Sequence, residues 1–175
     1  TLLIKEDAPV YAACIGLFVI VGKKKYRNGA VIFVTSVVYF LVVTYFMGKY
    51  GLGIMDSRFT NYMADASKGG LIDVIRNFIT NPAYVVEECF KPEKLSFMFY
   101  MIFPLGFLPL ASKKVSGLIL FIPVILENLA SNYKYQYSIN FQYVFGTVAI
   151  LTYLAIVNYS ELAEKTRRFM AGFAI

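Results

Sequence analysis

Long apolar runs without a charged side chain constrain this chain more than any other feature of its sequence. Residues 29–48 contain no charged residue and are rich in Val, Phe and Tyr, and residues 135–160 are also uncharged. Since a helix of about 20 mostly apolar residues crosses the hydrocarbon layer of a bilayer, runs of this length are typical of membrane spans. The chain has 175 residues, of which 58% are hydrophobic and 16% charged. The sequence therefore predicts an all-α integral membrane protein.

Five segments are long enough, or nearly long enough, to cross a bilayer. The first would be roughly 22 Å long at about 1.5 Å per residue, and it crosses only if Lys23 and Lys24 extend their amines to the headgroups. We expect a polytopic bundle of about five transmembrane helices that forms one membrane domain. The expected spans are residues 8–22, 29–48, 95–112, 115–131 and 144–159, with a long polar loop over residues 49–94.

Prolines predict where two of these spans depart from a regular helix. Pro104 and Pro109, with Gly106 between them, must break or kink the third span, because each proline removes a backbone donor. Pro123 lies in the fourth span, where neighbouring helices can absorb a kink.

Basic residues distinguish the two sides of the predicted bundle. Connections at residues 23–27, 112–114 and 165–168 hold nine Lys and Arg against Glu161 and Glu164, whereas the opposite connections carry equal numbers of basic and acidic residues. Because short cytoplasmic loops are enriched in Lys and Arg, we expect a multi-pass cell-membrane protein whose basic loops are cytoplasmic. The external loops are then residues 49–94 and 131–142. The net charge of +6 indicates contact with anionic lipid and does not indicate nucleic-acid binding.

The inventory of residues excludes several kinds of reactive site. The chain has no His and only two cysteines, Cys14 in an apolar run and Cys89 in a polar segment, so these residues cannot form a zinc site or a Cys–His nucleophile. The sequence contains no glycine-rich phosphate loop and no serine nucleophile motif. We expect no metal and no cofactor, and the residues alone do not identify a reaction.

The external loop has the pattern of short amphipathic helices at a membrane surface. Apolar side chains in residues 71–79 repeat at helical spacing, and Asn81-Pro82 is typical of the start of a second short helix over residues 83–90. These helices either only cover the outer mouth of the bundle or form the lid or floor of a site.

Three polar features are candidates for a binding site on the external side. Glu127 lies near the outer end of an apolar helix, where it either reaches headgroup water, pairs with a basic loop residue, or binds a cation or hydroxyl groups. Residues 131–143 alternate aromatic side chains with amides and hydroxyls, a pattern that either anchors a helix at the interface or recognises a carbohydrate or polar headgroup. Arg58 suits a phosphate or carboxylate, although a lone Arg is more often part of a surface ion pair. The candidate substrate-binding residues are Arg58, Asn61, Glu127, Tyr137, Asn140 and Gln142.

An ordered series of short motifs extends from Arg58 to about Asn158. The motifs are Ser57-Arg58-Phe59, Asn81-Pro82-Ala83-Tyr84-Val85, Lys91-Pro92-Glu93-Lys94-Leu95, Phe103-Pro104-Leu105-Gly106-Phe107-Leu108-Pro109-Leu110, Pro123, Asn128-Leu129-Ala130-Ser131 and Gln136-Tyr137-Ser138-Ile139-Asn140-Phe141-Gln142-Tyr143. With these motifs the chain resembles a bacterial and archaeal membrane family called domain of unknown function 2079.

The resemblance implies a relative of the C-type glycosyltransferases, which use lipid-phosphate-linked sugars on the outer face of the membrane. Membrane lipid and a polyprenyl-phosphate sugar donor are then the expected partners. In that superfamily the catalytic acid lies in the first external loop, near the N-terminus of the full protein. No residue here matches that acid, so the catalytic residue stays unknown and we expect this chain to be a C-terminal fragment. The alternatives are a non-catalytic transporter or lipid-handling protein, and a purely structural membrane module.

Overall fold

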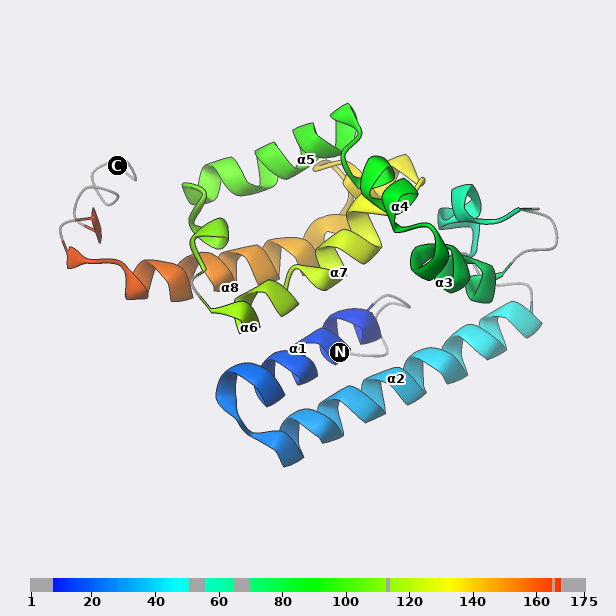
Figure 1. The fold of residues 1–175 in the computed structure, drawn as a ribbon, viewed down its shortest axis with the longest axis horizontal. Helices are drawn as coiled ribbons and strands as arrows, with labels where there is room; N and C mark the ends of the chain where they lie inside the picture. The colour runs from blue at the N-terminus through cyan, green and yellow to red at the C-terminus, as the bar shows by residue number, and fades with distance from the viewer. Residues whose placement is uncertain (1–7, 51–55, 65–69, 113, 165, 168–175) are drawn as a thin grey trace.

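A computed structural model describes residues 8–50, 56–64, 70–112, 114–164 and 166–167 (Figure 1). Helices and short turns make up these residues, and no β-strand occurs among them, so the predicted all-α fold is confirmed. The α-helices are α1 (Ala8–Lys23), α2 (Tyr26–Lys49), α3 (Leu71–Thr80), α4 (Pro82–Cys89), α5 (Pro92–Ile102), α6 (Val115–Ile119), α7 (Ile122–Val124) and α8 (Phe145–Glu161).

Shorter helical turns join these helices. They are the 3-10 turns η1 (Asp56–Arg58), η2 (Thr60–Tyr62), η3 (Phe103–Leu105), η4 (Leu108–Ala111), η6 (Lys134–Tyr137) and η7 (Gln142–Val144), and the π-helical turn η5 (Ile125–Leu129). Figure 1 shows α1 and α2 below α6, α7 and α8, with α5 above them and α3 and α4 at the right-hand end.

Helices α1 and α2 form an antiparallel hairpin in which backbone approaches backbone. The connection between them includes Lys24 with a φ of 53°. A Cβ atom added at Gly16 would lie 2.7 Å from the backbone nitrogen of Phe33, and one added at Gly29 would lie 2.7 Å from the backbone oxygen of Gly16. Small residues allow this kind of close approach between membrane helices. The two glycines therefore set the distance between α1 and α2.

Among the residues that the structure describes, two helical segments are long and apolar enough to span a membrane. They are Tyr26–Lys49 and Gln142–Glu161, whereas Ala8–Lys23 and Val115–Leu129 are apolar but shorter. The face of α2 that includes Val31, Val34 and Val38 is exposed, with each of these side chains more than half accessible. An apolar, exposed helix face of this kind suits contact with lipid. The bundle of five spans stays a prediction.

The expected third span, residues 95–112, is not one continuous α-helix. Helix α5 ends at Ile102, and the chain continues through η3, a left-handed pair at Gly106 and Phe107 with φ of 59° and 57°, and η4. The physical reason is Pro104, which has no backbone N–H to continue the helical hydrogen bonds and clashes with the preceding turn. The predicted break is confirmed, and the regular helix covers less than half of the expected span, residues 95–102.

The helix starts within the long polar loop agree with the sequence pattern. Pro82 and Pro92 each occupy the first turn of a helix, in α4 and α5 respectively. Helix α3 differs from the single apolar face that was expected. Its Val74 is buried and Phe78 packs against the same core cluster, but Ile75 and Ile79 are 52% and 75% exposed. The helix thus presents one apolar stripe to the protein and a second one outward.

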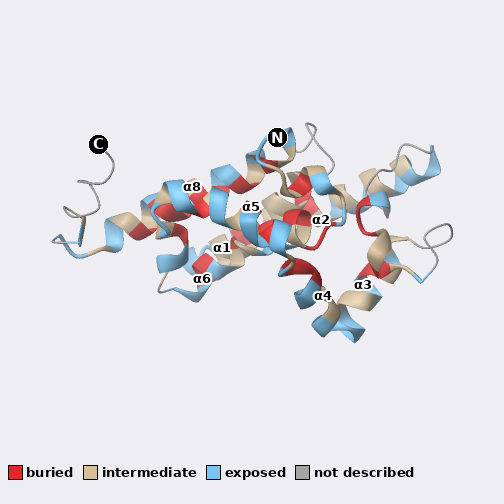
Figure 2. Cartoon of the chain, turned by 90° about the horizontal axis from the view of Figure 1, so that it is seen from above, coloured by how far each residue is buried: buried red, intermediate tan, exposed pale blue. Residues whose placement is uncertain are grey.

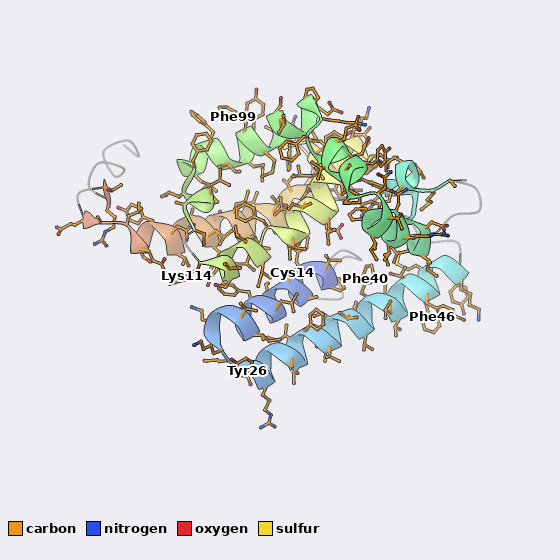
Figure 3. All side chains as sticks on the ribbon, viewed as in Figure 1. Cys14, Tyr26, Phe40, Phe46, Phe99 and Lys114 are labelled. Atoms are coloured by element: carbon orange, nitrogen blue, oxygen red, sulfur yellow. The ribbon has the colours of Figure 1, made fainter. Side chains whose placement is uncertain are left out.

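Two clusters of buried side chains hold the helices together. One joins the η1–α4 region to the end of η5, and Phe40 of α2 packs against it (Figure 3). The other lies where Leu120 meets Ile150 and Leu154 of α8. Figure 2 shows how buried residues concentrate along α8 and the segments beside it. Helix α8 has more buried residues than any other described helix, and one of the two clusters is built on it.

We predict that Gly16→Ala destabilises the protein by about 1–3 kcal/mol, because the added methyl group overlaps the backbone of α2. The matched control is Gly48→Ala, since a Cβ atom there meets nothing within 4 Å. Unfolding of both variants in detergent micelles, followed by circular dichroism, measures the difference. Equal stability of Gly16→Ala and the parent protein would contradict the close helix approach.

Candidate functional site

A buried amide, Asn128, stands at the centre of polar contacts that cross the bundle. Its Oδ1 atom accepts a hydrogen bond from the Thr147 hydroxyl at 2.5 Å, and its Nδ2 atom donates to the backbone carbonyl of Gln136 at 2.5 Å. The Tyr11 hydroxyl lies 3.5 Å from the same Oδ1 atom. Asn128 and Thr147 are both 0% exposed. Because unpaired buried polar groups are costly, these contacts fix η6 against η5 and α8.

The π-helical turn explains why the sequence neighbours Glu127 and Asn128 are both buried. The backbone N–H of Ala130 bonds to the carbonyl of Ile125 at 2.8 Å, five residues earlier, which widens the helix. The structure places Glu127 inside the protein, 3% exposed, rather than in headgroup water. Glu127 does not line the pocket described next.

Residues after η5 fold back into an open pocket of about 400 Å³. Its rings contact one another edge-on: the centroids of Tyr135 and Phe141 are 4.3 Å apart, and those of Tyr133 and Tyr143 are 5.7 Å apart. We call this feature the aromatic–amide pocket. It is lined by Tyr133, Tyr135, Asn140, Phe141, Gln142 and Tyr143.

Arg58 comes to the edge of the aromatic–amide pocket from η1. Its backbone carbonyl accepts hydrogen bonds from the Asn132 N–H at 2.9 Å and the Ser131 hydroxyl at 3.1 Å. Its guanidinium carbon lies 5.3 Å from the centroid of the Tyr143 ring, within the range of a cation–π contact. The side chain is buried, 3% exposed. The loop that follows η5 therefore holds Arg58 against a ring of the pocket.

A second polar group, the Glu88 cluster, lies where α4 meets α5. The Glu88 carboxylate accepts a hydrogen bond from Asn61 Nδ2 at 3.0 Å and lies 2.5 Å from Lys91 Nζ and 3.7 Å from Lys94 Nζ. Lys94 is 1% exposed, and its Nζ atom lies 5.3 Å from the centroid of the Tyr137 ring. The cluster therefore ties η2, α4 and α5 to η6.

Burial changes the ionisation of the groups in and beside the Glu88 cluster. It lowers the pKa of Lys94 from its usual value of 10.5, and the carboxylate of Glu88 opposes part of this shift. Burial also raises the pKa of the Cys89 thiol and of the Tyr137 phenol. Each shift favours the neutral form, as expected for groups withdrawn from water.

The six candidate residues fall into three places. Asn140 and Gln142 line the aromatic–amide pocket together, and Arg58 stands at its edge. Asn61 and Tyr137 instead contact the Glu88 cluster, and Glu127 is buried in the bundle. No single cavity lined by all six side chains is found among the residues that the structure describes.

Sequence reasoning missed Glu88, Lys94 and Asn128. Glu88 and Lys94 belong to a polar stretch that has the composition of a solvated loop, and their burial depends on contacts with distant residues such as Tyr137. Asn128 offered a usable signal, since an amide in an otherwise apolar segment requires a buried partner.

The arrangement can bind and orient a polar ligand, and its described residues supply no self-contained reactive centre. Within the described ranges, no three His, Cys, Asp or Glu side chains gather to hold a metal ion. The pocket offers flat aromatic faces, two amide side chains and one nearby cation. These groups suit a ligand with hydroxyls, C–H faces and a negative charge.

Comparison with known proteins identifies one family. A family model described as "Predicted membrane protein (DUF2079)" matches residues 1–175. Searches of curated proteins and of solved structures gave no match.

Replacing the two partners of the buried ion pair should reduce the stability by unequal amounts. Glu88→Gln leaves the Lys94 ammonium buried without its nearest carboxylate and should cost about 3–5 kcal/mol of stability. In Lys94→Met the carboxylate keeps Lys91 and Asn61, so the stability should change by less than about 1 kcal/mol. Chemical unfolding of both full-chain variants at pH 7 measures the asymmetry, and equal losses would contradict it.

The Glu88→Gln variant should also regain stability at alkaline pH. The pKa of Lys94 is lower in the folded protein than its usual value of 10.5 in the unfolded chain. At pH values between these two pKa values, the unfolded chain therefore binds more protons than the folded protein, and the free energy of unfolding rises with pH. Stability of this variant relative to Lys94→Met should therefore increase with pH in that window. If the difference in stability between Glu88→Gln and Lys94→Met stays flat or falls with pH, Lys94 is not buried as a charged group.

Proposed function

The chain belongs to the DUF2079 family of predicted membrane proteins, and we propose that it forms the external, substrate-holding part of a glycosyltransferase that uses lipid-phosphate-linked sugars. The observation that carries the proposal is the aromatic–amide pocket with Arg58 at its edge. The pocket precedes α8 directly, at the start of the candidate span Gln142–Glu161. A ligand there is at the level of the lipid headgroups.

Four side chains of the pocket, and Arg58 beside it, have roles that their chemistry suits. Aromatic faces of Tyr135 and Phe141 pack against the C–H surface of a sugar ring, and the amides of Asn140 and Gln142 donate to and accept from its hydroxyls. Arg58 lies against the Tyr143 ring and supplies the positive charge that attracts the phosphate of the donor toward the pocket. The chain's own residues bind and orient the donor, and the catalytic acid is expected elsewhere in the full protein.

The charges at the two ends of α8 support the proposed orientation in the membrane. The aromatic–amide pocket lies at its start, and Lys114 pairs with Glu161 at its end, near the basic residues 23–27. With the positive end facing the cytoplasm, the pocket opens to the outside. Lipid-phosphate-linked sugars presented on the outer face would then meet it.

A non-catalytic lipid-handling protein is the second candidate. The observation that favours it is the buried polar path from Tyr11 through Thr147 and Asn128 to Gln136. Polar groups at such depth occur in proteins that move polar substrates across membranes. Sugar transfer by the full-length protein supports the first candidate, and transbilayer movement of a lipid-linked sugar without transfer supports the second.

Cysteine labelling tests the proposed orientation. In a variant without Cys14 and Cys89, a cysteine at Ala83 should react with a membrane-impermeant maleimide added to intact cells, because Ala83 is exposed on α4. A cysteine at Arg27, in the basic segment at the other end, should react only after the membrane is permeabilised. The reverse pattern would overturn the orientation.

Replacement of Gln142 tests recognition by the pocket. If its amide binds a donor hydroxyl, Gln142→Leu should weaken binding of a polyprenyl-phosphate sugar by about 2- to 10-fold, since a neutral hydrogen bond contributes about 0.5–1.5 kcal/mol. Calorimetry on the full-length protein in nanodiscs measures the dissociation constant. The matched control is Asn28→Leu, which removes an exposed amide from α2. Unchanged affinity in Gln142→Leu, with normal folding, would leave only a membrane-anchoring role for residues 131–143.

A further inference from the structure

A second cavity lies at the C-terminal end of α8, whereas the aromatic–amide pocket lies at its N-terminal end. It occupies about 70 Å³ between α1, α6 and α8, enough for several water molecules or the oxygens of a small polar group. Phe18 and Leu154 are among its apolar walls. We call it the α1–α6–α8 crevice, and its polar rim consists of Lys23, Ser112, Lys114, Ser116, Asn158 and Glu161.

The ends of the candidate spans indicate that the crevice lies at the level expected for lipid phosphates. Helix α2 begins at Tyr26, directly after the end of α1, and the second candidate span ends at Glu161. Both candidate spans therefore have an end beside the crevice, at the boundary between hydrocarbon and headgroups. Figure 3 shows Lys114 at the start of α6, next to the end of α1.

The charges at this end of the molecule favour an anion. The described basic residues at this end are Lys23, Lys24, Lys25, Arg27, Lys114 and Arg167, and the acidic residues are Glu161, which lies on the rim, and Glu164. Glu161 is already paired with Lys114. Lys23, by contrast, contacts only the Phe18 ring in the described contacts, with its Nζ atom 5.9 Å from the centroid.

We propose that the α1–α6–α8 crevice binds the phosphate of an anionic phospholipid. Lys23 attracts the phosphate, the Ser116 hydroxyl donates a hydrogen bond to it, and the apolar side chains outside the crevice contact the acyl chains. Leu118 of α6 and Ile156 of α8 are 56% and 64% exposed and provide such a surface. Basic pockets between membrane helices bind anionic lipid headgroups through this combination of charge and apolar surface.

The salt bridge gives the proposal a test with effects of opposite sign. Lys23→Gln removes the attracting charge and should weaken binding of phosphatidylglycerol about 5-fold, the equivalent of ~1 kcal/mol per basic side chain at a membrane surface. Glu161→Gln releases Lys114 from its partner and removes a negative charge from the rim, so binding should become tighter. Arg27→Gln is the matched control, because it removes the same charge from α2, which does not line the crevice.

Native mass spectrometry of the full chain, titrated with phosphatidylglycerol or phosphatidylcholine of the same acyl length, measures the affinities. We expect one tightly held phosphatidylglycerol and weaker binding of phosphatidylcholine. The affinity for phosphatidylglycerol should be highest in Glu161→Gln, intermediate and equal in the parent protein and Arg27→Gln, and lowest in Lys23→Gln. Equal losses in Lys23→Gln and Arg27→Gln would show attraction by surface charge alone and overturn the site.

Inorganic phosphate distinguishes a lipid from a soluble anion. At millimolar concentration it should leave the phosphatidylglycerol adduct in place, because the acyl chains contribute to binding. Complete displacement would assign the crevice to a free phosphate and contradict the lipid. The aromatic–amide pocket contributes no residue to this site, so the result is independent of sugar recognition.

Discussion

The buried amide of Asn128 is the interaction on which the arrangement of η5, η6 and η7 depends. It accepts from Thr147, donates to the backbone carbonyl of Gln136, and has no access to solvent. In a low-dielectric interior, a hydrogen bond that is made is strong and one that is lost is costly, so the partners are held in one arrangement. The π-helical turn makes this possible, because the added residue turns both Glu127 and Asn128 inward.

The aromatic–amide pocket follows from that arrangement. Because Asn128 holds Gln136 against the bundle, residues 131–143 fold back over η5 and bring their rings together as the aromatic–amide pocket. The same loop bonds to the backbone of Arg58 and holds it at the pocket edge. The Glu88 cluster fastens the other side of η6 through Lys94 and Tyr137. A rigid scaffold of this kind preserves the orientation of the Asn140 and Gln142 amides, as the proposed recognition of hydroxyls requires.

Features set by local chemistry could be predicted from the sequence, and those set by distant contacts could not. Charge-free runs gave the all-α membrane class, and Pro82, Pro92 and Pro104 marked helix starts and a break, because proline acts on its own turn. The division of the candidate residues between pocket and cluster depends on tertiary folding: Asn140 and Gln142 meet the pocket, whereas Tyr137, a few residues earlier, turns to Lys94. Burial of Lys94 in a polar stretch likewise requires a ring far along the chain.

Photocrosslinking tests the central claim, that the aromatic–amide pocket holds a lipid-phosphate-linked sugar, most directly. A polyprenyl-phosphate sugar carrying a diazirine on the sugar would be irradiated with the full-length protein in nanodiscs, and the labelled peptides mapped by mass spectrometry. The account predicts labelling within residues 131–143 and at the Arg58 segment, suppressed by unlabelled donor. Labelling confined to other segments, or unaffected by unlabelled donor, would contradict it.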